Sequence, residues 1–312
     1  MFLYPVNDST KFSNTGYSFG AQNRDTVTGD RSQLLTWLSP LSPGLRHWDI
    51  QELRVNEVGE WLFKTDEFRR WYAGSERGEG ENAVLFCYGD PGVGKTFIRY
   101  QGFFLRRESK PVLTGYDDSS LVADGLCDLA SGQNTAVSCF YFDFGAGKEQ
   151  SATNVLGSLL KQIIGGMESI PEEILRAFQQ QKTTLGGRRP QLVNIVKMLQ
   201  LITSSQRTFM CIDAIDECPG GQRIRLLDSL NEILVKAPGT RIFATGRPYT
   251  RAEVEKRLSG HLTSVSINPA KEGVITYLHA RLSKDETPDA MDQSLEAEIL
   301  EKIPGDVSGM YV

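Results

Sequence analysis

A glycine-rich loop constrains the fold of this chain more than any other feature of its sequence. Residues 86–97 read FCYGDPGVGKTF and contain the pattern G-x-x-x-x-G-K-[ST]. In such a loop the glycines let consecutive backbone N–H groups turn toward an anion, the lysine reaches nucleotide phosphates, and the last hydroxyl ligates Mg²⁺. The predicted nucleotide-binding residues are Gly89, Asp90, Pro91, Gly92, Val93, Gly94, Lys95 and Thr96, with Thr96 also a ligand of Mg²⁺. An ordinary surface turn can share these letters, but the apolar run 83–88 before the loop favours the phosphate-binding interpretation.

The order of the remaining segments predicts the fold class. Apolar runs typical of buried strands are 83–88, 136–144, 208–216, 240–246 and 264–268. Helical spacing of apolar residues occurs between them, at 151–166, 190–204, 222–236, 250–258 and 270–282. Strands that alternate with helices indicate a mostly parallel sheet covered on both faces. We therefore expect an α/β protein with a three-layer P-loop NTPase core.

Composition divides the chain into four parts. Residues 1–40 are rich in polar residues and glycine, which predicts a flexible N-terminal arm. A helical preamble is expected over 41–80, followed by the NTPase core over 81–268. The segment 269–312 is expected to begin a helical subdomain that is truncated in this chain.

Acidic residues follow the apolar run at 208–216, where the sequence reads FMCIDAIDE. Carboxylates at the carboxyl end of a strand lie where open α/β sheets bind ligands. Beside a phosphate loop, Asp213 is expected to hold Mg²⁺, and Asp216 and Glu217 are expected to orient and deprotonate the attacking water. If the strand extends two residues further, Asp216 becomes the metal-binding acid instead. A solvated acidic turn is the alternative without function.

An arginine follows the next predicted strand, in the stretch FATGRPY. Pro248 keeps Arg247 out of helical backbone angles, and a guanidinium at this strand end can contact the γ-phosphate of a nucleotide. An ordinary loop arginine is the alternative. The sequence has no N-K-x-D pattern typical of guanine recognition, so ATP is the expected nucleotide.

Composition also bears on partners and location. The formal net charge of −5 argues against a general nucleic-acid-binding surface. The opening MFLYPVNDS lacks a basic leader, and no segment has the length and apolar character of a membrane span, so a cytoplasmic protein is expected.

Several stretches together resemble a known family. WLSPLSPGLRHWD, FCYGDPGVGKT, CFYFDFGAGKEQSATNVLGSLLKQI, CIDAIDEC, RIFATGRP and VEKRLSG are similar to fungal NACHT proteins of the STAND class. In these proteins a nephrocystin-like N-terminal NTPase region is often followed by ankyrin repeats. The likeness extends over about residues 36–312.

The resemblance implies an ATP-dependent signalling switch whose nucleotide state controls self-association of the NACHT domain. It assigns Lys95 and Thr96 to the phosphate motif, Asp213 to magnesium, Asp216 and Glu217 to the acids that follow, and Arg247 to a sensor of the nucleotide. ATP, ADP and Mg²⁺ are the implied ligands, and a downstream effector or repeat domain is expected to be missing from this chain.

The sequence departs from the family pattern at 99–118, RYQGFFLRRESKPVLTGYDD. Family members pass directly from the helix after the phosphate loop to a segment like SSLVADGLCDLA, and Pro111 and Gly115 would break a continuous helix. We interpret 99–118 as an insertion, arising from an unremoved intron or a lineage-specific loop.

Two other functional classes remain open. The same acids could serve a phosphotransferase or motor ATPase with steady turnover, although the sequence shows neither an acceptor pocket nor an arginine-rich lid. A non-hydrolysing, nucleotide-dependent interaction module is also compatible with the sequence.

Overall fold

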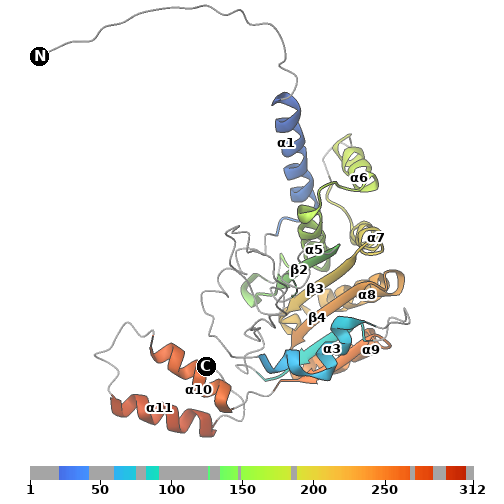
Figure 1. Cartoon of the computed structure of the whole chain (residues 1–312). Coiled ribbons are helices and arrows are strands. Elements are labelled where there is room, and N and C mark those ends of the chain that lie inside the picture. Colours follow the sequence, from blue (N-terminus) through green and yellow to red (C-terminus); the bar gives the residue numbers. More distant parts are fainter. Residues whose placement is uncertain are drawn as a thin grey trace, which may run out of the picture.

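The computed structural model describes residues 21–41, 60–74, 82–90, 126, 134–146, 149–183, 188–267, 271–283 and 293–306. Within them a five-stranded sheet forms the centre of the molecule (Figure 1). The strands are β1 (Val84–Tyr88), β2 (Thr135–Tyr141), β3 (Arg207–Asp213), β4 (Thr240–Gly246) and β5 (Leu262–Ser266). Their order is β2-β3-β4-β1-β5, and all neighbouring pairs are parallel. The predicted three-layer α/β fold is confirmed.

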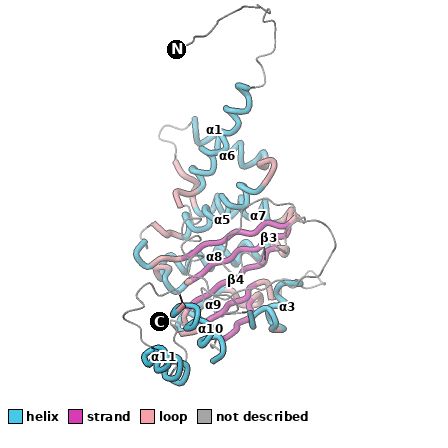
Figure 2. The backbone as a smooth tube through the Cα atoms, turned by 60° about the vertical axis from the view of Figure 1, so that its left-hand side comes forward, coloured by secondary structure: helices cyan, strands magenta, loops and turns pink. Residues whose placement is uncertain are grey.

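The two faces of the sheet carry separate apolar cores. Successive residues of a strand point to opposite faces, so in β1 Val84 and Phe86 enter one buried cluster while Leu85 and Cys87 enter the other. Figures 1 and 2 show the helices arranged on the two sides of the sheet. Burial on both faces explains why β1, β3 and β4 read as nearly continuous apolar runs.

The first face is covered by a series of helices that link the strands. They are α5 (Ala152–Gly166), α6 (Glu172–Thr183), α7 (Leu192–Thr203), α8 (Gly220–Lys236) and α9 (Arg251–Arg257). The sequence predicts α5, α7, α8 and α9 within a few residues of these limits, but α6 was not predicted. Its side chains Ile174 and Phe178 are nevertheless buried in the first core.

The helix α1 (Ala21–Leu38) occupies a stretch where the sequence predicts a flexible arm. Its large apolar residues are concentrated in the last turns, where Leu34 and Leu38 are buried in the first core. Arg31 fastens the helix to α5, because its Nη2 donates hydrogen bonds to three carbonyl oxygens at the end of that helix, those of Ile164, Gly165 and Met167. The sequence did not predict this helix, because it has no amphipathic pattern along its length. Long-range packing at one end of the helix orders it instead.

The second face is covered by the part of the preamble that the structure describes, namely the 3₁₀ turn η1 (Glu60–Lys64) and α3 (Asp66–Ala73). Thr65 caps α3, because its hydroxyl accepts a hydrogen bond from the N–H of Phe68. Trp71 is fully buried, and its indole N–H donates to the carbonyl oxygen of Ala83 at 3.1 Å.

Two arginines hold the carboxyl end of α3 against the sheet. Arg241 of β4 donates from Nε to the carbonyl oxygen of Trp71 at 3.1 Å, and Arg207 of β3 donates to that of Tyr72. The guanidinium of Arg207 also lies over the rings of Tyr72 and Phe209. These contacts satisfy helix carbonyls that have no partner within the helix and place positive charge at the negative end of the helix dipole.

Beyond β5 the structure describes α10 (Lys271–Leu282) and α11 (Gln293–Asp306), which contact each other (Figure 1). The predicted insertion 99–118 lies outside the described residues. No helix in the described ranges has both the length and the apolar character that crossing a membrane requires.

Candidate functional site

The carboxyl ends of β1, β3 and β4 lie at one edge of the sheet. The connection from β1 runs to β2, at one side of the sheet, whereas the connection from β4 runs to β5, at the opposite side. The two connections therefore run in opposite directions from the neighbouring strands β1 and β4. Open α/β sheets bind ligands at such a point. Gly89, directly after β1, donates its N–H to the carbonyl oxygen of Gly246 at the end of β4 at 3.2 Å. The phosphate-loop sequence thus begins next to the stretch TGRP.

Only the start of the predicted phosphate loop is described. Gly89 is buried and Asp90 is exposed at the edge of the sheet. Pro91, Gly92, Val93, Gly94, Lys95 and Thr96 lie outside the described residues. Their contacts with phosphate and Mg²⁺ stay predictions.

Gly246 is required where β4 meets β1. A Cβ atom at this position would lie 2.9 Å from Oγ1 of Thr250, 3.1 Å from a methyl of Ile215 and 3.1 Å from the ring of Phe86. The close packing of three elements around Gly246 leaves no room for a side chain. This glycine therefore lets the β4 loop approach both the β1 loop and the acidic turn.

Asp213 ends β3, and Thr245 of β4 holds it in place. The Thr245 hydroxyl donates a hydrogen bond to Oδ1 of Asp213 and accepts one from the N–H of Ala214 at 2.9 Å. Ala214 has φ 54° and ψ 48°, the left-handed region that side-chain-bearing residues rarely adopt. This backbone reversal turns the next residues, 215–217, back along the edge of the sheet as the 3₁₀ turn η4.

Asp216 and Arg247 form an ion pair between the acidic turn and the β4 loop. Oδ2 of Asp216 lies 3.0 Å from Nε of Arg247, and Oδ1 accepts the backbone N–H of Arg247 at 3.2 Å. The Asp216 side chain is only 4% exposed, whereas that of Arg247 is 44% exposed. The carboxylate therefore holds the arginine at the rim of the site.

Arg223 of α8 holds the acidic turn, residues 213–217, in place through hydrogen bonds to backbone carbonyl oxygens. Its Nη1 donates to the carbonyl oxygens of Cys218 at 3.0 Å and Asp216 at 3.3 Å, while its Nε pairs with Glu253 of α9 at 2.7 Å. Both partners of this ion pair are mostly buried. Sequence reasoning missed Arg223 and Thr245. Thr245 could have been found, because it is the first residue of the stretch TGRP, whereas no local pattern indicates a role for Arg223.

Glu217 lies on the same turn and contacts the loop after β2. Its Oε2 accepts the N–H of Phe144 at 3.0 Å. The pKa of Glu217 is raised, mainly by burial and by the negative charge of Asp216, and the hydrogen bond from Phe144 offsets part of this rise. A carboxylate with a raised pKa beside a ligand-binding edge is typical of a general base.

The geometry brings together Asp213, Asp216, Glu217 and Arg247 beside Gly89. No group of three or more His, Cys, Asp or Glu side chains suited to a metal occurs in the described ranges. Mg²⁺ keeps several waters and takes one or two carboxylates together with substrate phosphates, so a single aspartate fits this ion. Both oxygens of Asp216 are already bound by Arg247, which favours Asp213 as the metal-binding acid.

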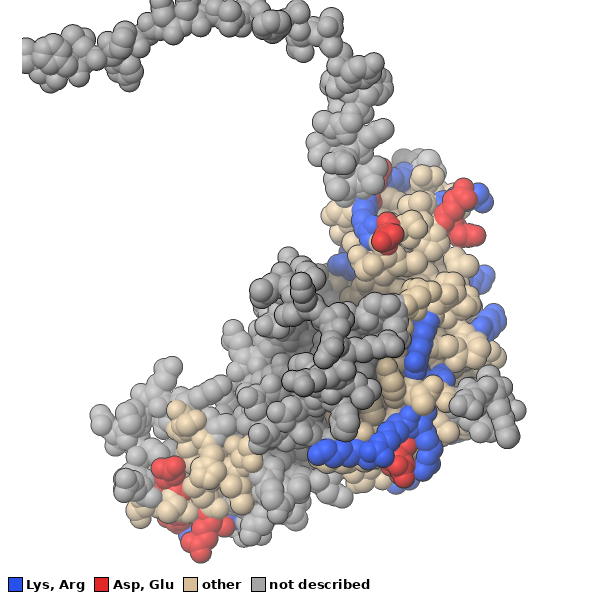
Figure 3. Space-filling model, viewed as in Figure 1, with Lys and Arg blue, Asp and Glu red and all other residues tan. Residues whose placement is uncertain are grey.

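Charged side chains on the outer surface are mixed rather than uniformly basic. Figure 3 shows lysines and arginines gathered over α3 with acidic side chains among them. Lys64, Arg69 and Arg70 are exposed there, and Arg69 lies 3.6 Å from Asp66. The absence of a nucleic-acid partner stays a prediction.

Several solved structures are loosely similar to this chain. They include the ORC1 protein of Aeropyrum pernix in complex with DNA, with 14% identity, 81% of this chain and 57% of that chain covered, and a TM-score of 0.43. CDC6P of Pyrobaculum aerophilum has 11% identity, covers 64% and 43%, and gives 0.37. A Walker-type ATPase of Pyrococcus abyssi has 12% identity, covers 81% and 66%, and gives 0.40. The chain spans 57% of the first of these structures, and likenesses this loose transfer no activity.

Sequence comparison is more specific. No curated protein matched the chain. A family model described as Nephrocystin 3, N-terminal, matches residues 57–101 and 119–247, more than half of the chain. The matched stretches include the phosphate-loop pattern, the acidic turn and Arg247, and they leave out 102–118. The chain therefore belongs to the Nephrocystin 3, N-terminal, family.

Proposed function

We propose that this chain is an ATP-binding, slowly hydrolysing signalling switch of the NACHT type within the STAND class. The observation that carries the proposal is the docking of Arg247 on Asp216 at the edge of the sheet where the phosphate-loop sequence begins. An arginine held by a carboxylate, yet nearly half exposed, can exchange that partner for a phosphate. Two competing partners for one side chain are the basis of a two-state element.

Each residue of the proposed site has a role that follows from its position. Lys95 would bind the nucleotide phosphates, and Thr96 and Asp213 would hold Mg²⁺, which neutralises phosphate charge when bound. Glu217 would accept a proton from the attacking water, since its raised pKa makes it a stronger base than an ordinary carboxylate. Asp216, which the sequence suggested as a catalytic acid, is better placed to position Arg247 than to contact water.

The switch is favoured over a rapid ATPase because the contacts at the site restrain it. Thr245, Arg223 and Asp216 each tie the acidic turn to a neighbouring element. Movement of Arg247 away from Asp216 would break both contacts between these two residues at once, so the change of state is cooperative. We further propose that nucleotide state controls self-association in the cytoplasm. An effector or repeat domain, of the ankyrin kind often present in the fungal NACHT proteins that the sequence resembles, would receive the signal.

One set of measurements tests the proposal. Fluorescent ATP is titrated into the purified chain with Mg²⁺, phosphate release is followed over many turnovers, and light scattering reports mass with ATP or ADP. We expect binding, slow turnover, and a larger mass with ATP only. Lys95→Ala should abolish binding, whereas Lys64→Ala, an exposed lysine on η1, should leave it unchanged.

The other outcomes identify the alternatives. Fast turnover at constant mass would indicate an ordinary ATPase or, with a small-molecule acceptor, a phosphotransferase. Tight binding without any turnover would indicate a non-hydrolysing interaction module. Equal ATP affinity in Lys95→Ala and the unmodified chain would contradict the nucleotide site altogether.

A further inference from the structure

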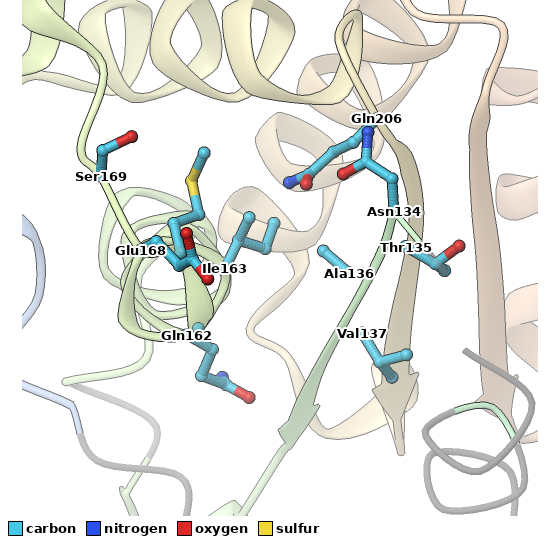
Figure 4. A pocket seen from close by; sticks show the side chains of 11 residues that line it. Asn134, Thr135, Ala136, Val137, Gln162, Ile163, Glu168, Ser169 and Gln206 are labelled. Carbon is cyan, nitrogen blue, oxygen red and sulfur yellow. The ribbon is translucent and has the colours of Figure 1, made fainter. Parts of the chain in front are cut away.

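A cavity of about 490 Å³ lies beside β2, the outermost strand on its side of the sheet. It is at the start of β2, away from the carboxyl ends of the strands, where Asp213 and Arg247 lie. Those carboxyl ends are called the nucleotide edge below. Its walls are the first half of β2, the end of α5 and the residues just before β3. Figure 4 shows Asn134 and Gln206 at the same end of the cavity, with Ala136 and Val137 along the strand. No residue of the nucleotide edge lines it.

Backbone direction along β2 decides which groups face this cavity. The N–H of Phe142 donates to the carbonyl oxygen of Asp213 next to β3, so even-numbered residues turn their backbone groups toward β3. Odd-numbered residues consequently turn theirs toward the open edge. Among the described residues, no hydrogen bond reaches the outward N–H and C=O groups of Thr135 and Val137. An edge of this kind is a template for another strand.

Gln162 of α5 already uses the next outward position. Its Oε1 accepts the N–H of Cys139 at 3.0 Å, and its Nε2 donates to the carbonyl oxygen of Cys139 at 2.8 Å. A carboxamide carries the same donor and acceptor as a peptide group. The side chain of Gln162 therefore pairs with Cys139 as one residue of a neighbouring strand would. Next to the cavity, at Thr135 and Val137, no side chain takes this place in the described structure.

The cavity also contains a donor without a partner. Nε2 of Gln206 is buried and makes no hydrogen bond within the described structure. Buried polar groups are normally paired, so an unpaired amide beside an open strand edge indicates an occupant with a carbonyl to offer. The lining consists of amide, hydroxyl and apolar side chains, and Glu168 at the exposed rim is its single charged side chain among the described residues. An uncharged occupant matches this lining best.

We propose that this cavity binds an uncharged, extended peptide segment of a partner protein, which adds as a short strand beside Thr135 and Val137. The main chain of the peptide pairs with the outward groups of these residues, and a carbonyl of the peptide accepts from Gln206. Gln162 limits the added strand at Cys139, so only a few residues are accommodated. Main-chain pairing supplies the affinity in this mode of recognition, and the pockets beside the strand select the side chains.

The test uses a peptide of five alternating threonine and valine residues, acetylated and amidated at its ends. It is added at millimolar concentration to the isotope-labelled full chain, and amide resonances are followed by NMR. We expect the resonances of Thr135, Val137 and the Gln206 side chain to shift in a saturable way, while those of the nucleotide edge stay in place. A peptide with the same side chains, N-methylated at alternate residues, should bind at least about tenfold more weakly, because hydrogen bonds are lost.

Val137→Pro provides the matched variant, since proline is tolerated at an edge strand whose N–H points outward. It removes the docking N–H without removing a bond to β3, and it should abolish the shifts at unchanged ATP affinity. No shift at Thr135 and Val137 would overturn the proposal. Equal binding of the methylated peptide to the unmodified chain would also overturn it, because the cavity would then recognise side chains alone. None of these outcomes depends on nucleotide hydrolysis.

Discussion

Asp216 contacts Arg247 through both of its carboxylate oxygens, one to the side-chain Nε and one to the backbone N–H. The two residues follow neighbouring strands, β3 and β4. The pair therefore couples the position of the acidic turn to that of the arginine. We propose that Asp216 positions Arg247. The catalytic role that the sequence suggests for Asp216 stays a prediction.

Replacement of this carboxylate should release the arginine. In Asp216→Asn the amide oxygen still accepts the backbone N–H, but the ion pair to the guanidinium is lost. Because Arg247 is 44% exposed, the free energy of unfolding should fall by less than about 1 kcal/mol. We expect the preference for ATP over ADP, measured by calorimetric titration, to rise several-fold. Arg247→Met should remove that preference, and an unchanged ATP-to-ADP affinity ratio in Asp216→Asn would refute the coupling.

The raised pKa of Glu217 predicts a specific dependence of stability on pH. A carboxyl whose pKa is higher in the folded state stabilises the fold only while it is protonated, and this contribution is lost as pH rises through the folded pKa. Glu217→Gln, which keeps an acceptor for the N–H of Phe144, should therefore raise the melting temperature at neutral pH and lose that advantage in acid. Its ATP hydrolysis should be strongly reduced at every pH. Melting curves that run parallel across the pH range would contradict the shift.

Thr245 should matter for Asp213 although it contacts no nucleotide. Thr245→Val removes the hydroxyl that bonds Asp213 and Ala214, leaves the partly buried N–H of Ala214 unpaired, and should cost about 1–3 kcal/mol of unfolding free energy. The apparent affinity for Mg²⁺ with ATP should weaken, as it should in Asp213→Asn. Thr240→Val is the matched control on the same strand, because the buried hydroxyl of Thr240 has no hydrogen-bond partner in the described structure. Equal denaturation midpoints for the two valine variants would count against the role of Thr245.

The helix α1 is expected to depend on one glycine of α5. A Cβ at Gly157 would lie 2.4 Å from the carbonyl oxygen of Leu38, a backbone atom that cannot rotate away. Gly157→Ala should therefore destabilise the protein by about 1–3 kcal/mol and make residues 21–41 more sensitive to limited proteolysis. In the same helix, a Cβ at Gly165 meets nothing within 4 Å, so Gly165→Ala should be neutral or slightly stabilising. Similar proteolysis patterns for both variants would argue against tight docking of α1.

The segment 99–118 should be dispensable if it is an insertion. The family model passes over 102–118, which supports that interpretation. Deletion of 99–118 should raise the melting temperature by several degrees, because a continuous helix after the phosphate loop would bury apolar residues that the insertion separates. Transcript sequencing tells an unremoved intron from a lineage-specific loop. A deletion variant with a lower melting temperature and weaker ATP binding would show that the segment belongs to the fold.

Much of the sheet is predictable from local sequence. The sequence gives all five strands within about three residues of their limits. For β1, β3 and β4 the reason is burial on both faces, which leaves a continuous apolar signal. The ladder between β3 and β4 also brings Asp213 and Arg247 to one edge, as the positions of the two motifs suggested. Local patterns suffice where a residue's surroundings repeat along the chain.

Long-range contacts set the limits of that prediction. The polar sequence of α1 gives no periodic signal, and its order depends on a carbonyl packed against Gly157 and on Arg31 reaching α5. Likewise, the sequence shows that Asp216 and Arg247 are near the same strand ends, but it does not show that one binds the other. This pairing depends on the left-handed backbone conformation of Ala214. An alanine gives no indication of that conformation in the sequence.

The arginine contacts of α3 have a consequence for how the chain acquires its structure during synthesis. Trp71 and its partner Arg241 are 170 residues apart, so α3 leaves the ribosome long before β4 exists to receive it. At ribosomal rates of about 5–20 residues per second, the aromatic face of α3 waits roughly 10–30 s for its place on the sheet. During that interval the aromatic face of α3 lacks Phe209 of β3 and Phe243 of β4, whose rings later lie against Trp71. We therefore expect the nascent segment that contains α3 to bind chaperones that recognise aromatic residues.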